Sequence, residues 1–219
     1  MFESITDDIW GTIGQIVLIM AGGGFVLLLE HIRQWALEWF RYRRLHALAR
    51  SVMANRNVHT SLVELRTKTD ADRSYVVLFH NGQTFSNKNP VWRTSCTQES
   101  CKAGVSHLIE KHQNILASLV WDTVAPLFDN KCAPGIIPFE VGKHTVLHVE
   151  VDKMDDSFTK NSMIGGGIKT KFMIALHDQK HEIVGLLGVD YCREDSFDMS
   201  LIAKEIIQAS SNVQYALET

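Results

Sequence analysis

The sequence predicts an α+β protein, in which an N-terminal transmembrane helix continues into an amphipathic helix and then into a soluble domain. In that domain we expect a central antiparallel sheet flanked by helices. Three observations predict this order: an uncharged apolar run over residues 9–29, an apolar stripe at helical spacing over residues 30–55, and alternating helix and strand patterns over residues 56–219. Residues 1–8 form a short polar N-terminus.

The run over residues 9–29 reads IWGTIGQIVLIMAGGGFVLLL and contains no charged residue. About 20 mostly apolar residues in a helix cross the hydrocarbon core of a bilayer, so this length predicts a single span. A signal peptide would begin with basic residues and end at a small-residue cleavage site, whereas this run follows the acidic MFESITDD. A buried core helix is the alternative, and an uncharged terminal stretch of this length rarely takes that role.

Three glycines, Gly22, Gly23 and Gly24, follow one another in the middle of the predicted span. Small residues allow membrane helices to approach closely, so we expect this block to serve membrane helix packing or to bend the helix. The alternative is a soft spot in a monomeric anchor, because each glycine weakens a helix by roughly 1 kcal/mol.

The charges on either side of the span predict its orientation. The preceding residues carry acidic side chains and no lysine or arginine. Five arginines follow the span: Arg33, Arg41, Arg43, Arg44 and Arg50. Because basic residues close to a span favour the cytoplasmic side, the soluble domain is expected in the cytoplasm.

The segment of residues 30–55 is predicted to be an amphipathic helix beside the membrane. Its stripe at alternating spacings of three and four consists of Ile32, Trp35, Trp39, Tyr42, His46, Ala49 and Met53. The other side is rich in arginine, which suits an anionic lipid surface. Three roles therefore stay open for this helix: it lies on membrane lipid, it pairs with a second copy of the chain in a homo-oligomer, or it packs on the domain.

The remaining residues, 56–219, are enough for one domain with a sizeable core. Their patterns predict a short helix ending near residue 67, a buried strand over 75–79, a helix over 105–119, strands over 145–151, 171–176 and 183–191, and a helix beginning near 196. Asn81-Gly82 directly follows the first strand and predicts a hairpin turn. The net charge of −3, without a basic cluster, argues against a nucleic-acid partner.

The domain shows no motif for catalysis. It lacks the Lys-Ser/Thr that completes a phosphate loop, the Gly-x-Ser-x-Gly nucleophile motif and an Asp-x-Asp-x-Asp-Gly calcium loop, so we expect no enzyme and no cofactor. Cys96 and Cys101 are close enough in sequence to pair as a disulfide in a periplasmic domain, and would be thiols in the cytoplasm. Their spacing, with no second pair, falls short of a zinc ribbon or knuckle, so no metal site is expected.

Two blocks of the domain resemble GAF domains. The run GGGIKTKFMIALHDQKHEIVGLLGVDYCREDSFDMSLIAKEIIQAS is similar to the closing hairpin, glycine-containing strand and helix of that family, and LVELRTKTDADRSYVVLFHNG to its opening helix and first strand. The resemblance implies a GAF/PAS-like fold for residues 56–219. Ala175 stands where the family often has proline, and the signatures of the cyclic-nucleotide and haem sensors are absent, so no particular ligand is implied.

The layout as a whole resembles the holins of T-even-type phages, which have one span near the N-terminus and a soluble PAS/GAF-like domain. The similarity lies in the helix that leads into residues 75–79 and in the strand, turn and helix that begin at residue 183. It implies a protein of the host inner membrane that self-associates, permeabilises the membrane and releases endolysin, with a periplasmic domain that receives an antiholin. The arginines after the span depart from that layout.

Two functions follow from these observations. The first is a holin-like membrane protein whose soluble domain times host cell lysis. The alternative is a membrane-tethered GAF-type sensor or adaptor, with a cytoplasmic domain that binds a ligand or a protein. Orientation in the membrane separates them.

Overall fold

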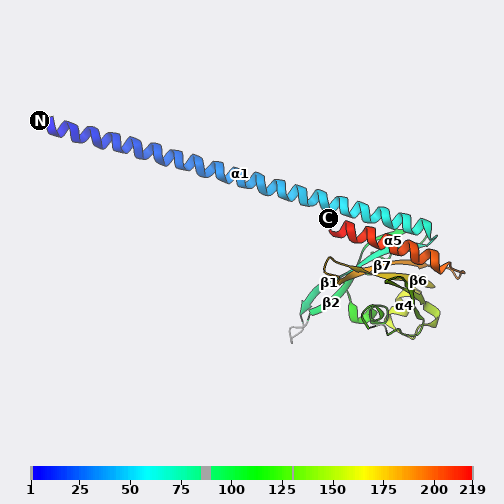
Figure 1. Ribbon diagram of the computed structural model, residues 1–219. Helices are drawn as coiled ribbons and strands as arrows, with labels where there is room; N and C mark the ends of the chain where they lie inside the picture. Colours follow the sequence, from blue (N-terminus) through cyan, green and yellow to red (C-terminus); the bar gives the residue numbers. More distant parts are fainter. Residues whose placement is uncertain (1, 85–89, 130, 219) are drawn as a thin grey trace. The chain divides into compact units, whose positions relative to one another are not determined.

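The computed structural model describes the backbone of residues 2–84, 90–129 and 131–218, and for residues 2–28 it describes the backbone alone. The chain divides into two compact units, Met1–Ser51 and Val52–Thr219, which we describe separately (Figure 1).

The first unit is helical and belongs to α1, which extends over Phe2–Lys68. The predicted amphipathic segment is helical throughout, and its aromatic side chains are exposed, Trp35 by 64%. Within the residues that the structure describes, no helix is long and apolar enough to cross a membrane. The structure describes no side chain before residue 29. The predicted span of residues 9–29, and the packing role predicted for Gly22, Gly23 and Gly24 in it, therefore lie outside the described side chains except at residue 29.

The second unit is built on a seven-stranded sheet in which all neighbouring strands are antiparallel, in the order β3-β2-β1-β7-β6-β5-β4. The strands are β1 (Arg73–Thr84), β2 (Pro90–Cys101), β3 (Ile115–Leu116), β4 (Ile136–Val141), β5 (His144–Glu150), β6 (Thr170–His177) and β7 (Ile183–Tyr191). This sheet, with helices on both faces, is the predicted α+β arrangement.

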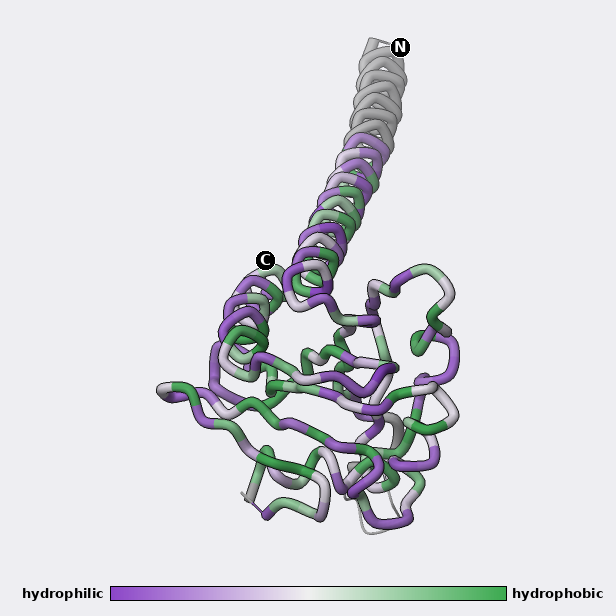
Figure 2. The backbone as a smooth tube through the Cα atoms, turned by 90° about the vertical axis from the view of Figure 1, so that its right-hand side faces the viewer, coloured by the Kyte–Doolittle hydropathy of each residue, from purple (hydrophilic) through white to green (hydrophobic). Residues whose placement is uncertain are grey.

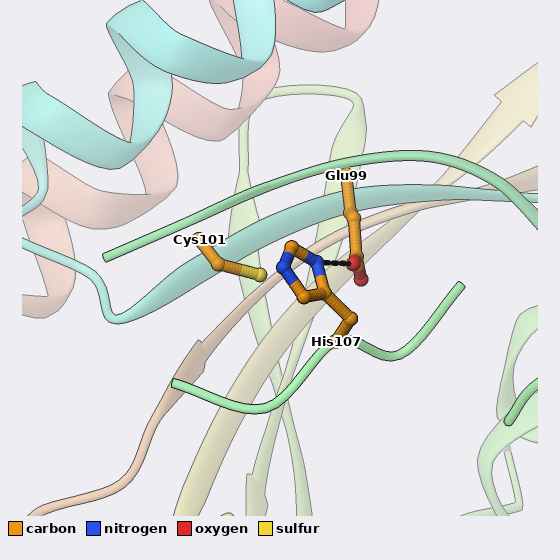
Figure 3. A group of neighbouring side chains, drawn as sticks. All are labelled: Glu99, Cys101 and His107. Atoms are coloured by element: carbon orange, nitrogen blue, oxygen red, sulfur yellow. Dashed lines mark hydrogen bonds and ion pairs between the residues drawn. The ribbon is translucent and has the colours of Figure 1, made fainter. Parts of the chain in front are cut away.

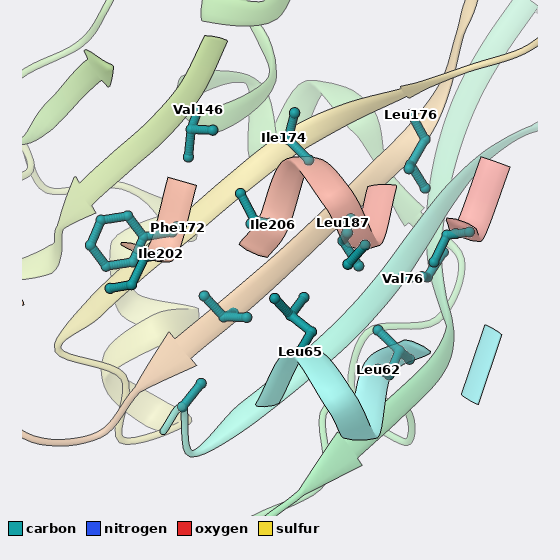
Figure 4. Packing of buried hydrophobic residues seen from close by; sticks show 14 of the residues in the cluster. Leu62, Leu65, Val76, Val146, Phe172, Ile174, Leu176, Leu187, Ile202 and Ile206 are labelled. Carbon is teal, nitrogen blue, oxygen red and sulfur yellow. The ribbon is translucent and has the colours of Figure 1, made fainter. Parts of the chain in front are cut away.

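One face of the sheet is covered by the end of α1 and by α5 (Met199–Glu218). Val58, Leu62 and Leu65 recur at helical spacing and pack with Ile202 and Ile206 in a buried cluster against the central strands (Figure 4). Hydrophilic and hydrophobic residues alternate along α5 (Figure 2), as expected for a helix with one buried side. This cluster is the larger part of the hydrophobic core.

The other face is covered by short helices and loops. These elements are η1 (Ala117–Val120), α2 (Trp121–Val124), α3 (Pro126–Asp129), η2 (Val151–Lys153) and α4 (Phe158–Gly165). Successive side chains of a strand point to opposite faces, so β1 sends Val76 into the α5 cluster and Tyr75 and Val77 into the second one. The candidate site lies on this second face.

The predicted helix over residues 105–119 is wrong. Leu108, Ile109 and Ile115 do pack against the second cluster, whereas Leu119 is exposed. The backbone forms turns, then β3 and η1, and Asn114 has a φ of 60°. Tertiary partners take the hydrogen bonds that a helix would have made: the Cys96 N–H donates to the His112 carbonyl at 2.7 Å, and the Glu99 carboxylate accepts the Leu108 N–H. The helical spacing of apolar residues therefore marked partly buried positions in this segment, although no helix forms.

The middle of the domain differs from the expectation in three further places. Asn81-Gly82 is no turn: β1 and β2 pair past it, with an irregularity between Asn81 and Gln83, as far as Thr84 and Pro90. The connecting residues 85–89 lie outside the described part of the chain. Strand β4 and helix α4 carry no clear apolar period and were not expected, although Ser157 caps α4 by accepting the Lys160 N–H at 3.2 Å.

Candidate functional site

A partly enclosed cavity of ≈ 50 Å³ lies between the sheet and the short helices of the second face. Strands β1, β6 and β7 form its floor, and α2, α4 and the loop around residue 112 form its walls. Its lining is mostly apolar and includes Val77, Leu108, Val120, Val124, Met163, Ile168, Met173 and Leu186. Four polar side chains also reach it from the walls and strand β2: Thr94, Thr123, Thr159 and Ser162.

Three charged side chains form a row across the floor of this face. In the strand register, Asp190 of β7 pairs with Arg73 of β1 on one side and with Lys171 of β6 on the other. All three are buried, with exposures of 0% for Asp190, 1% for Arg73 and 8% for Lys171. Arg73 Nη1 donates to Asp190 Oδ2 at 2.8 Å, whereas Lys171 Nζ lies 3.6 Å from Oδ1.

This row carries an excess of positive charge. Two cations and one carboxylate give a net charge of +1, and the 3.6 Å separation of Lys171 from Asp190 exceeds an ordinary N–H···O hydrogen bond of about 2.7–3.2 Å. Lys171 Nζ instead lies 5.0 Å from the centre of the Tyr75 ring, and Lys171 lines the cavity. Because buried charges are costly unless paired, the ammonium group favours a negatively charged group in the cavity.

Tyr75 adds a second polar group to the floor. Among the described residues, its hydroxyl has no hydrogen-bond partner of good geometry, although it is fully buried. Burial, followed by the nearby carboxylate of Asp190, raises the pKa of Tyr75 well above its usual value, so the hydroxyl is neutral and can donate. A neutral, buried hydroxyl without a partner is suited to donate a hydrogen bond to an oxygen atom of a ligand.

The position of Tyr75 depends on a glycine opposite it in the sheet. Gly188 pairs with Tyr75, and a Cβ atom at Gly188 would lie 2.2 Å from Tyr75 Oη. The glycine in the GVDY run therefore leaves space for the tyrosine ring over β7.

His112 belongs to the wall of the cavity as a neutral side chain. Its Nε2 lies 3.0 Å from Thr94 Oγ1. Burial, with a smaller contribution from Lys171, lowers the pKa of His112 to about 4. At neutral pH the histidine is thus a hydrogen-bonding group and adds no charge to the site.

The Ala-Asp-Arg run before β1 ties the start of this strand to the end of β7. Asp72 accepts the Cys192 N–H at 2.7 Å and an Arg193 N–H at 3.1 Å, while Arg73 reaches the carboxylate of Asp190. The Asp72-Arg73 pair therefore has a structural role: it fixes the register that brings the charged row together.

The site residues predicted from sequence do not form this site. Cys96 and Cys101 are free thiols on the same strand, β2, where five residues of extended chain separate their Cα atoms by about 15 Å. A disulfide needs Cα atoms within about 7 Å, so the pairing left open for a periplasmic domain does not fit the geometry of this strand.

The charged row was not found from sequence, because its three members are far apart in the chain and only the strand register joins them. A signal was present: Lys171 and Asp190 each stand next to a continuous apolar run of a buried strand, residues 172–176 and 183–189. Charged residues inside such strands are rarely fully buried unless paired, so each predicts a partner on a neighbouring strand.

No family model and no curated protein matches this sequence. Solved structures do match. The GAF domain of PixJ from Thermosynechococcus elongatus, in its blue-light absorbing form, has a TM-score of 0.53 at 12% identity, over 77% of this chain and 88% of that one. The phycoerythrobilin-bound GAF domain of a cyanobacterial phytochrome has a TM-score of 0.53 at 16% identity, over 80% and 91%.

A far-red cyanobacteriochrome photoreceptor is similar as well, with a TM-score of 0.50 at 13% identity, over 84% of this chain and 96% of that chain. At such identities the matches show the fold alone. They confirm the GAF-like prediction for the soluble part and give no support to the holin resemblance.

Proposed function

We propose that the chain is a GAF-type sensor or adaptor, tethered to a membrane through residues 9–29, whose cavity binds a compact ligand with an acidic group. The observation that carries this proposal is the buried row of Arg73, Asp190 and Lys171 beside the cavity. The GAF-like fold supports it, because one neighbour described above is a photoreceptor by its name and another is named for its blue-light absorbing form. The arginines after the span favour a cytoplasmic domain.

The ligand class follows from the size and lining of the cavity. Sites for drug-sized ligands measure about 300–1,000 Å³, so ≈ 50 Å³ suits a much smaller molecule. The apolar wall favours a hydrocarbon part, and Lys171 with the Tyr75 hydroxyl favours two oxygens at one end. A short-chain carboxylate combines these properties, and no chemical reaction is proposed for it.

A route from the cavity to α1 exists within the second unit. The Ser74 hydroxyl donates to the Leu62 carbonyl of α1 at 2.7 Å, and the Tyr191 hydroxyl donates to the Thr69 carbonyl at 2.9 Å. Ser74 and Tyr191 directly follow Arg73 and Asp190 in their strands. A ligand that shifts the charged row therefore acts on the backbone where α1 ends.

The test is a thermal-unfolding series on the full-length chain in detergent. Straight-chain carboxylates of increasing length are compared with the alcohols of equal length, on the natural chain and on Lys171→Met. We expect one or more acids to raise the melting temperature, the matched alcohols to raise it less, and the variant to lose the difference. Equal effects of acids and alcohols, or an unchanged response of Lys171→Met, would contradict the proposal.

A further inference from the structure

A second group of side chains lies outside the cavity, on the outer part of the sheet. Glu99 and Cys101 are two residues apart on β2 and so point to the same side, and His107 comes from the loop that follows (Figure 3). One ligand atom from each residue, a carboxylate oxygen, a thiol sulfur and an imidazole nitrogen, lies within 4.8 Å of the other two. The sequence alone did not reveal this group, because a single cysteine takes part.

The local structure holds this group in place. The Glu99 side chain is 4% exposed, and its Oε2 accepts the N–H of Leu108 at 2.7 Å and that of Ile109 at 3.1 Å. Its other oxygen, Oε1, meets His107 Nδ1. The carboxylate thus orders the loop that carries His107 and keeps one oxygen directed toward the imidazole.

We propose that Glu99, Cys101 and His107 bind a divalent transition-metal ion, with Zn²⁺ as the best match. Sulfur, nitrogen and oxygen ligands bind zinc tetrahedrally at about 2.0–2.3 Å, which places two ligands of one ion about 3.3–3.8 Å apart. The observed separations therefore need small side-chain movements. Three protein ligands leave a fourth, solvent-accessible position, as in zinc sites that keep a water molecule.

The charges and protons of the site balance. The ion replaces the direct contact of Glu99 Oε1 with His107 Nδ1. The imidazole binds in its neutral form through a nitrogen without a proton, with the ring's proton on the other nitrogen, and the thiol of Cys101 releases its proton to solvent. One thiolate and one carboxylate then neutralise the two charges of the ion.

An entry path for the ion is present. Glu99 and His107 line a surface groove of ≈ 460 Å³, to which Asn55 and His59 of α1 also contribute. The His107 side chain is 61% exposed and can turn toward an arriving ion. The site shares no residue with the lining of the cavity, and Arg73 lies close to the site, since its Nη2 donates to the carbonyl of Ser106, which precedes His107.

The test uses the full-length chain, stripped with a chelator and titrated with Zn²⁺ against a colorimetric chelator, and separately with Co²⁺. We expect one Zn²⁺ per chain and a thiolate-to-cobalt charge-transfer band. Cys101→Ser and His107→Ala should each weaken Zn²⁺ binding at least about tenfold, since losing even an outer-shell partner costs 10–100-fold. Cys101→Ser should also abolish the band.

Two matched variants serve as controls: Cys192→Ser, a partly buried cysteine elsewhere, and His59→Ala, an exposed histidine on the same groove. Both should bind Zn²⁺ as the natural chain does. The proposal is overturned if the natural chain gives no thiolate band with Co²⁺, if Cys101→Ser keeps full Zn²⁺ affinity, or if His59→Ala loses as much affinity as His107→Ala. Circular dichroism of each variant establishes that it is folded.

Discussion

Replacing Asp190 by asparagine removes the carboxylate that lies between two buried cations. Arg73 Nη1 then loses its partner at 2.8 Å, and Lys171 loses the oxygen at 3.6 Å. Breaking a buried ion pair by removing one partner costs about 3–5 kcal/mol, because the remaining charge stays buried without compensation. The free energy of unfolding of native proteins is about 5–15 kcal/mol in total, so the expected loss is a large fraction of the stability.

The assay is urea and thermal unfolding of the full-length chain followed by circular dichroism. With about 2–4 °C per kcal/mol for a chain of 150–250 residues, Asp190→Asn should lower the melting temperature by about 6–20 °C. Adding Lys171→Met in the same chain should restore part of the loss, since it removes one unpaired charge. Glu110→Gln, on an exposed acid, is the control and should change stability by no more than about 0.5 kcal/mol.

A loss below about 1 kcal/mol for Asp190→Asn would refute this reasoning, because it would mean that water or movement of the strands compensates Arg73 and Lys171. A further loss on adding Lys171→Met would refute it as well, since the lysine would then stabilise the domain by packing alone.

Three further outcomes follow from the structure. Because the pKa of His112 falls from an ordinary value near 6.5 to about 4, stability should be complete above about pH 6.5 and decline by up to roughly 3 kcal/mol toward pH 4, and a His112→Gln chain should show a smaller decline in urea unfolding across that range. Gly188→Ala should cost about 1–3 kcal/mol in urea unfolding, since its Cβ would meet Tyr75 Oη at 2.2 Å, whereas Gly165→Ala in α4 meets no atom within 4 Å and should be neutral. A protease added outside spheroplasts should leave the soluble domain intact. Loss of the domain by cleavage from outside would favour the periplasmic arrangement of the holin prediction.

The elements that sequence predicted well are those whose own pattern matches their burial. The middle parts of strands β6 and β7, residues 172–176 and 183–189, are wholly apolar, and α5 carries Ile202, Ile206 and Val213 on one side, so period and structure agree. The prediction of a helix over residues 105–119 failed because the backbone of this segment is held by partners on another strand, such as the carboxylate of Glu99 on β2. No local pattern contains that information.

The site was harder to predict than the fold for the same reason. Arg73 and Asp190 are 117 residues apart and meet through the pairing of β1 with β7, which sequence spacing does not specify. The Ala-Asp-Arg run belongs to the segment that resembles the opening helix and first strand of GAF domains, but its function in holding the register is shown by the bonds of Asp72 to Cys192 and Arg193. The glycine block of residues 22–24 stays a prediction.

Binding of a short-chain carboxylate in the cavity is the central claim, and methyl NMR of the methionines tests it most directly. Met163 and Met173 line the cavity, whereas Met53 is exposed on α1 and serves as the internal reference. Titration of the full-length chain with the acid that stabilises it most should shift the Met163 and Met173 signals to saturation, leave Met53 in place, and have no such effect on Lys171→Met. Unmoved signals of Met163 and Met173, or equal shifts in the variant, would contradict the claim.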